Sequence, residues 1–177
     1  MKTKDKNYAT KQIKEVIMDN NENVLQKIET VIGTGLLAGL AGTIAMTISQ
    51  NIEMKITGRK PSDSPAKAAR EVFDIKPVTE GKSEKVSNEI HVAYGTSLGV
   101  VRGALSLIGL TGLPASFIHL ITVWGGEMIM LPALRVAPPI TKEKPGEIAI
   151  EAVHQLVYAI TTGLVFDSIN QKHASKY

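Results

Sequence analysis

The longest uncharged segment is the feature that most constrains what this chain can fold into. Residues 30–52 form a run of 23 residues without a formal charge, and about 20 apolar residues in a helix are enough to cross a hydrocarbon layer about 30 Å thick. Small side chains at intervals of four let membrane helices approach each other closely. In this run they are Gly35, Gly39, Thr43 and Thr47. We therefore predict a transmembrane helix over residues 31–54.

A second helix is predicted over residues 90–110. His91 and Arg102 are eleven residues apart, about three helical turns, so both fall near one face of the helix. Three glycines at intervals of four form another stripe of small residues, namely Gly95, Gly99 and Gly103. Such a helix needs a close neighbour on its glycine side and polar neighbours on its charged side. The glycine stripes of the first two helices predict close helix packing, and we expect them to join two copies of the chain in a homo-oligomer.

Two further helices are predicted over residues 115–134 and 147–168. A second uncharged run spans residues 103–126, but glycines and a proline at 109–114 divide it into the end of one helix and the start of the next. Prolines at 132, 138 and 139 end the third helix, and Pro145 opens the fourth. The sequence thus predicts an all-α, four-helix transmembrane bundle within residues 30–170.

The polar segments lie outside these four helices. Residues 1–29 and 55–89 hold 14 of the 20 lysines and arginines, which is typical of charge flanking a membrane. Residues 1–29 are predicted to be an amphipathic tail of one or two short helices, interrupted at residues 19–21. Within the first loop, a Ser-Asp-Ser-Pro cap predicts a surface helix over residues 65–73. Residues 171–177 form a polar tail.

Composition excludes several functions. The chain has no cysteine, which removes disulfides, thiolate metal sites and cysteine nucleophiles. Aromatic residues make up only 5% of the chain, and no basic cluster interleaved with aromatics is present, so we expect no nucleic-acid partner. No Gly-x-Ser-x-Gly motif occurs, and we expect no catalytic residues and no enzymatic activity. The first residues are followed by polar sequence, so no cleaved signal peptide is expected.

Polar residues inside the apolar segments are the main functional signal, because charged groups in a membrane usually face the bundle interior. In an antiparallel bundle, the first and third helices end at the same membrane face, here named face A, where the second and fourth begin. Counting residues from face A places several polar side chains at similar depths. The predicted polar cluster consists of His91, Tyr94, Arg102, Glu127, Glu151, His154 and Tyr158.

Three interpretations of this cluster remain open. It could be a hydrogen-bonded network that fixes helix packing, a pathway for protons or solutes, or a haem or metal site with His91 and His154 as ligands. The spacing does not match a complete metal motif, so neither a metal nor a cofactor is expected. Arg102 needs an acidic partner, which is Glu127 if its side chain extends toward face A and Asp167 if it extends toward the opposite face. Trp124 is assigned only an interfacial position.

Several motifs together resemble a group of small bacterial integral membrane proteins similar to the YagU inner-membrane family. The resemblance covers residues 33–168 and implies a multi-pass protein of the inner (plasma) membrane, with the lipid bilayer as its partner. It implies no activity. A soluble helical domain is the remaining alternative, because charges interrupt three of the four helices. The motifs are 58–65 (GRKPSDSP), His91-x-x-Tyr-Gly95, His119 through Trp124-Gly125 to Leu131-Pro132, Ala137-Pro-Pro139, and His154 through Tyr158 and Gly163 to Asp167.

Overall fold

The described part of the chain is mostly helical and contains no strand, so the all-α prediction is confirmed. The computed structural model describes residues 2–59, 67, 71 and 80–174, with side chains at 18, 21–59, 67, 71 and 85–171. The predicted surface helix at 65–73 lies largely outside these residues. The elements are α1 (Lys2–Thr57), α3 (Glu80–Leu107), α4 (Gly112–Ala133), the short 3-10 helix η1 (Ile140–Lys142) and α5 (Pro145–Ala174).

Each predicted membrane helix falls within or close to one observed helix, but three of the observed helices extend well beyond the predicted bounds. α1 runs from Lys2 through residues 19–21 without the interruption that the sequence predicts. Asp and Asn are only mildly unfavourable in a helix interior, so flanking helical turns can carry the helix through them. α3 begins at Glu80, ten residues before its predicted start, and α5 continues to Ala174.

Glycines and prolines set the helix ends. Gly58, Gly109 and Gly112 have positive φ angles of 72°, 83° and 63°, a conformation that glycine adopts without a Cβ penalty. The amide of Gly58 donates to the Met54 carbonyl at 2.9 Å and closes the last turn of α1. Pro132 lies in the last turn of α4, one residue before the helix ends. The glycines and prolines that the sequence predicts as helix ends therefore lie at or near the observed helix ends.

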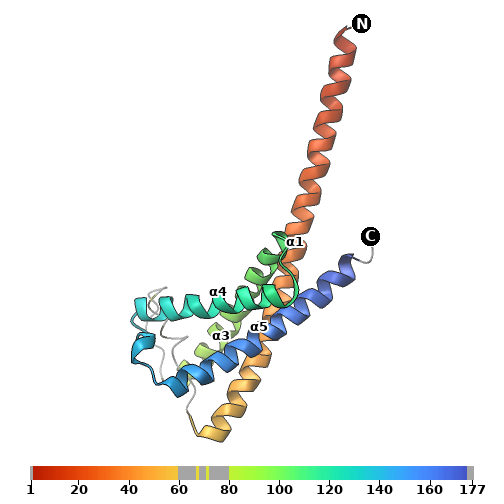
Figure 1. Ribbon diagram of the computed structural model, residues 1–177. Coiled ribbons are helices and arrows are strands. Elements are labelled where there is room, and N and C mark those ends of the chain that lie inside the picture. Colours follow the sequence, from red (N-terminus) through yellow and green to blue (C-terminus); the bar gives the residue numbers. More distant parts are fainter. Residues whose placement is uncertain (1, 60–66, 68–70, 72–79, 175–177) are drawn as a thin grey trace.

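Successive helices run in opposite directions, and the N-terminal half of α1 projects beyond the other three (Figure 1). α1 makes its most extensive contacts with α3 and α5, and α4 packs mainly on α5. The ends of α1 and α4 and the starts of α3 and α5 are directed toward the same side of the bundle, as expected for face A, although the end of α1 is set apart from that of α4 (Figure 1). The end of α3 and the start of α4 lie on the other side, which we name face B, beside the middle of α1 (Figure 1).

The predicted glycine stripes meet each other within one chain. A Cβ on Gly99 of α3 would lie 2.6 Å from the Cα of Gly39 on α1. A Cβ on Gly103 would lie 2.8 Å from the carbonyl oxygen of Val31, and one on Gly35 would lie 2.8 Å from that of Gly99. Gly95 faces the side chain of Thr43 in the same way. These glycine faces are covered within one chain, so an oligomer would need a different surface.

Many polar side chains are buried and many large apolar side chains are exposed, which is unusual for a protein in water. Among the described side chains, the largest that are almost fully buried include Arg102, His119 and His154, whereas many leucines and isoleucines are exposed. Exposed fractions on three helices reach 60% at Leu37, 62% at Phe117 and 62% at Leu164. The interior of this bundle therefore contains many polar side chains beside apolar ones such as Met46 and Phe166, and much of its surface is apolar.

Three helical segments are long and apolar enough to cross a membrane, judged by length and composition. They are Asn21–Thr57, Gly112–Ala133 and Pro145–Gln171. α3, the predicted second membrane helix, is not among them, because His91, Arg102 and its polar first turns lower its hydropathy. α3 nevertheless lies against α1, with further contacts to α4 and α5, so its neighbours cover much of its surface.

Candidate functional site

His154 connects the start of α5 to the end of α1. Its Nδ1 lies 2.9 Å from the hydroxyl oxygen of Ser49, and its Nε2 lies 3.8 Å from a carboxylate oxygen of Glu53. Glu53 also accepts two hydrogen bonds from the Arg59 guanidinium, at 2.8 and 3.1 Å. His154 is 2% exposed. The result is a chain of polar contacts leading from the end of α1 at face A into the bundle.

Glu127 connects α4 to α5 at a similar depth. The amide nitrogen of Gln155 donates a hydrogen bond of 2.5 Å to its carboxylate. Glu151, Tyr94 and Tyr158 all lie close enough to Glu127 to interact with its charge. Four of the predicted cluster residues are therefore neighbours, and they come from three helices.

Tyr158 lies at the centre of the bundle and joins three helices. Its hydroxyl donates to the carbonyl oxygen of Gly95 on α3 at 2.7 Å, and its ring centroid is 5.5 Å from that of His119 on α4. His119 is fully buried, with its Nε2 3.2 Å from the Leu98 carbonyl oxygen. Because a carbonyl oxygen can only accept, Nε2 carries the proton and Nδ1 is left as an acceptor.

Arg102 is fully buried nearer to face B, apart from the Glu127 group. Its guanidinium donates to a carboxylate oxygen of Asp167 at 2.5 Å and lies 5.0 Å from the centroid of the Phe166 ring. The other oxygen of Asp167 accepts from the Gly112 amide at 3.2 Å. Of the two predicted partners, Asp167 is therefore the one that Arg102 contacts. This pair joins the ends of α3 and α5 to the start of α4.

The interior contains more polar atoms than these contacts satisfy. Among the described side chains, Nε and Nη1 of Arg102, Nδ1 of His119 and Oγ1 of Thr162 are buried without a hydrogen-bond partner. Nε2 of the half-buried His91 is buried in the same way, and among the described residues His91 forms no hydrogen bond or ion pair with His154 or with the rest of the predicted cluster. An unpaired polar group in an apolar environment is costly, so these atoms mark places where ordered water would be stabilising.

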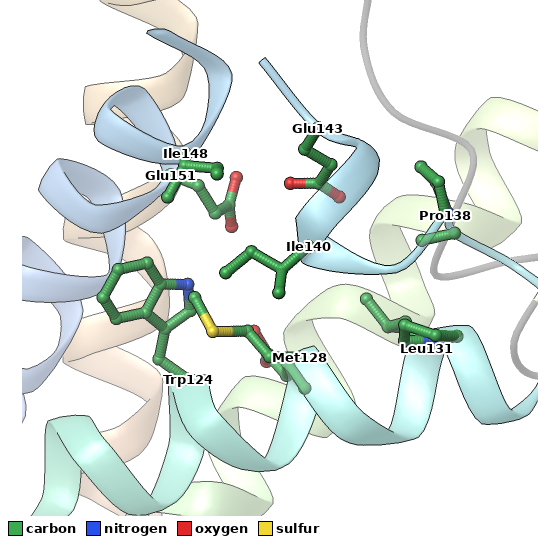
Figure 2. Close-up of a pocket in the computed structure, with 11 residues that line it drawn as sticks. Trp124, Met128, Leu131, Pro138, Ile140, Glu143, Ile148 and Glu151 are labelled. Carbon is green, nitrogen blue, oxygen red and sulfur yellow. The ribbon is translucent and has the colours of Figure 1, made fainter. Parts of the chain in front are cut away.

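A pocket of about 70 Å³ opens between α4, η1 and α5 near face A. Figure 2 shows the carboxylates of Glu143 and Glu151 directed into it from two elements, with Trp124 and Met128 on the α4 side. Glu127 is also part of the lining. The remaining wall is apolar and consists of Leu131, Pro132, Ala137, Pro138, Ile140 and Ile148.

Sequence reasoning missed four contributors to the polar cluster and the pocket. Ser49 and Gln155 form the closest contacts of His154 and Glu127, but an uncharged polar residue in an apolar run gives a weak signal by itself. Trp124 was assigned only an interfacial position, and η1 was not predicted. The pocket exists because the segment after α4 folds back over that helix, which the helical periodicity of α4 cannot indicate.

The described residues contain no group of three or more histidine, cysteine and acidic side chains placed to hold a metal ion. Comparison of the chain with protein-family models, with curated proteins and with solved structures found no match. The resemblance to the YagU family therefore stays a prediction, and the interpretation of the site depends on its geometry.

Proposed function

We propose that this chain is a multi-pass protein of the cytoplasmic membrane, in which buried polar residues fix the packing of four helices. One observation carries the proposal: charged and polar side chains are buried while leucines and isoleucines face outward. In water such a surface would drive aggregation, whereas lipid chains would cover it favourably. α3 is then a membrane helix whose polar residues are shielded by its neighbours.

Carbonate extraction of membranes that contain the tagged full-length chain tests this proposal. Alkaline carbonate releases peripheral proteins but leaves embedded helices in the pellet. We expect the chain to stay in the pellet and to be released only by detergent. Its appearance in the carbonate supernatant would contradict the membrane proposal and would favour the soluble helical alternative.

A pathway for protons or small solutes is the second candidate function. The observation that favours it is that buried polar groups occur at several depths of the bundle. They are Glu53 with His154 near face A, Tyr158 with His119 at the centre, and Arg102 with Asp167 near face B. Buried polar groups in membrane proteins commonly mark such routes.

Replacing Glu127 by Gln distinguishes these two functions, because the amide keeps the size of the side chain and can still accept from Gln155. If the network is structural, we expect the variant to fold with reduced thermal stability and no change in flux. If the network conducts, reconstituted vesicles that contain the variant should show altered proton or solute flux with unchanged folding.

Optical absorption and metal analysis of the purified protein test the third interpretation, a haem or metal site at His91 and His154.

A further inference from the structure

The pocket between α4, η1 and α5 carries a charge that its own walls do not balance. Among the described residues, neither Glu143 nor Glu151 forms a hydrogen bond or an ion pair with a basic side chain. The nearby Lys144 is paired instead with Glu147, at 3.6 Å. Glu127 also lines the pocket, and its hydrogen bond comes from the neutral Gln155. A site with this balance favours a cation.

The other walls of the pocket favour an organic cation over a bare metal ion. Trp124 presents an indole ring to the same space as the carboxylates (Figure 2), and aromatic faces attract ammonium groups. Most of the remaining lining is aliphatic. The three carboxylates do not form a group placed to hold a metal ion. An alkylammonium group would contact the apolar wall with its carbon atoms and the carboxylates with its N–H groups.

The size of the pocket limits the ligand. Its volume of about 70 Å³ is less than half of the ~150 Å³ of an apolar cavity that accepts benzene. We propose that this pocket binds a small primary ammonium ion of the size of methylammonium, held between Glu143 and Glu151 and beside the ring of Trp124. The inference depends on the geometry of residues 124–151 and not on the proposed role of the buried polar groups.

The chain provides its own reporter for this site. Trp124 is the only tryptophan in the sequence, so the tryptophan fluorescence of the purified full-length protein comes entirely from the pocket wall. We would titrate the protein in detergent with methylammonium chloride at constant ionic strength. The expected result is a saturable change in intensity or emission maximum. Methanol, a neutral molecule of similar size, and sodium chloride should give no saturable change.

Three substitutions separate binding in the pocket from a general effect of charge. Glu151→Gln and Glu143→Gln each remove one carboxylate from the pocket, and each should weaken binding at least about tenfold. Glu89→Gln is the matched control, because it removes the same charge from an exposed position of α3 outside the pocket lining and leaves the pair between Lys144 and Glu147 intact, and its affinity should equal that of the wild type. Glu143 lies just after η1 and outside the long helices, so its variant is testable even if Glu151→Gln fails to fold.

Circular dichroism of each variant verifies folding before the titration. A saturable response in the wild type that both pocket variants weaken, and that the control retains, supports the proposal. It would be overturned by a response that does not saturate, by an equal response to sodium chloride, or by unchanged affinity in either folded pocket variant. None of these results depends on whether the bundle conducts protons.

Discussion

Arg102 is fully buried, and the carboxylate of Asp167 balances its positive charge. Removing one member of a buried ion pair leaves the other charge uncompensated, which is more destabilising than removing both. We expect Asp167→Asn to lower the free energy of unfolding by about 3 kcal/mol. The double variant with Arg102→Met should recover part of that loss. Denaturant unfolding in detergent, followed by circular dichroism, measures both effects.

The pair Lys144–Glu147 is the matched control for this prediction. Its side chains are 83% and 56% exposed, and solvent-exposed pairs contribute about 0–1 kcal/mol. Glu147→Gln should therefore change the free energy of unfolding by no more than that. Equal destabilisation by Glu147→Gln and Asp167→Asn would show that the burial of Arg102 has no special cost.

Individual residues were predictable to different degrees. The sequence reduced the partners of Arg102 to two acids, because only Glu127 and Asp167 lie within reach along the helices. Choosing between them requires the direction of the Arg102 side chain, which depends on how α3 and α5 are rotated against each other. The rotations of α1 and α4 against α5 likewise bring Ser49 to His154 and Gln155 to Glu127. Spacing along one helix contains no information about it.

At the scale of the helices, the contact between α1 and α3 depends on the absence of side chains. Gly99→Ala would place a Cβ 2.6 Å from the Cα of Gly39, so the two backbones must separate. We expect a loss of about 1–3 kcal/mol in the free energy of unfolding, the usual cost of overpacking a tight interface. Thermal unfolding in detergent micelles measures it as a lower midpoint temperature.

Gly126 of α4 provides the control, because a Cβ there would meet nothing within 4 Å. Gly126→Ala should leave stability unchanged or raise it slightly, since alanine favours the helix by up to about 1 kcal/mol. If both alanine variants behave alike, the glycines act only through helix propensity and the close contact between α1 and α3 has no energetic role.

The helices themselves were largely predictable, because runs without charge and the glycines and prolines between them mark both helix length and helix ends. The helices that exceed prediction, α1 toward its N-terminus and α3 from Glu80, do so through polar sequence with no strong breaker. We expected the glycine stripes to join two copies of the chain, but the stripes of α1 and α3 contact each other within one chain. A stripe of small residues predicts a close partner without identifying it.

For the molecule as a whole, the central feature is the distribution of polarity, with polar side chains buried and many leucines and isoleucines exposed. It was predictable in outline, because charges inside apolar runs are expected to face the interior of a membrane bundle. The pocket was not, because it depends on residues 137–143 returning across α4. The membrane proposal therefore depends most on whether the exposed leucines and isoleucines face lipid.

Labelling of single cysteines tests that claim most directly, and the chain has no cysteine of its own. Ile44→Cys places a thiol in the middle of the apolar face of α1, where Ile44 is 51% exposed, and Lys142→Cys places one in η1. In open membrane fragments that expose both faces, a hydrophilic maleimide should label the cysteine at 142 and not the one at 44, and denaturation in detergent should make both reactive. Equal labelling of the two in intact membranes would contradict the account.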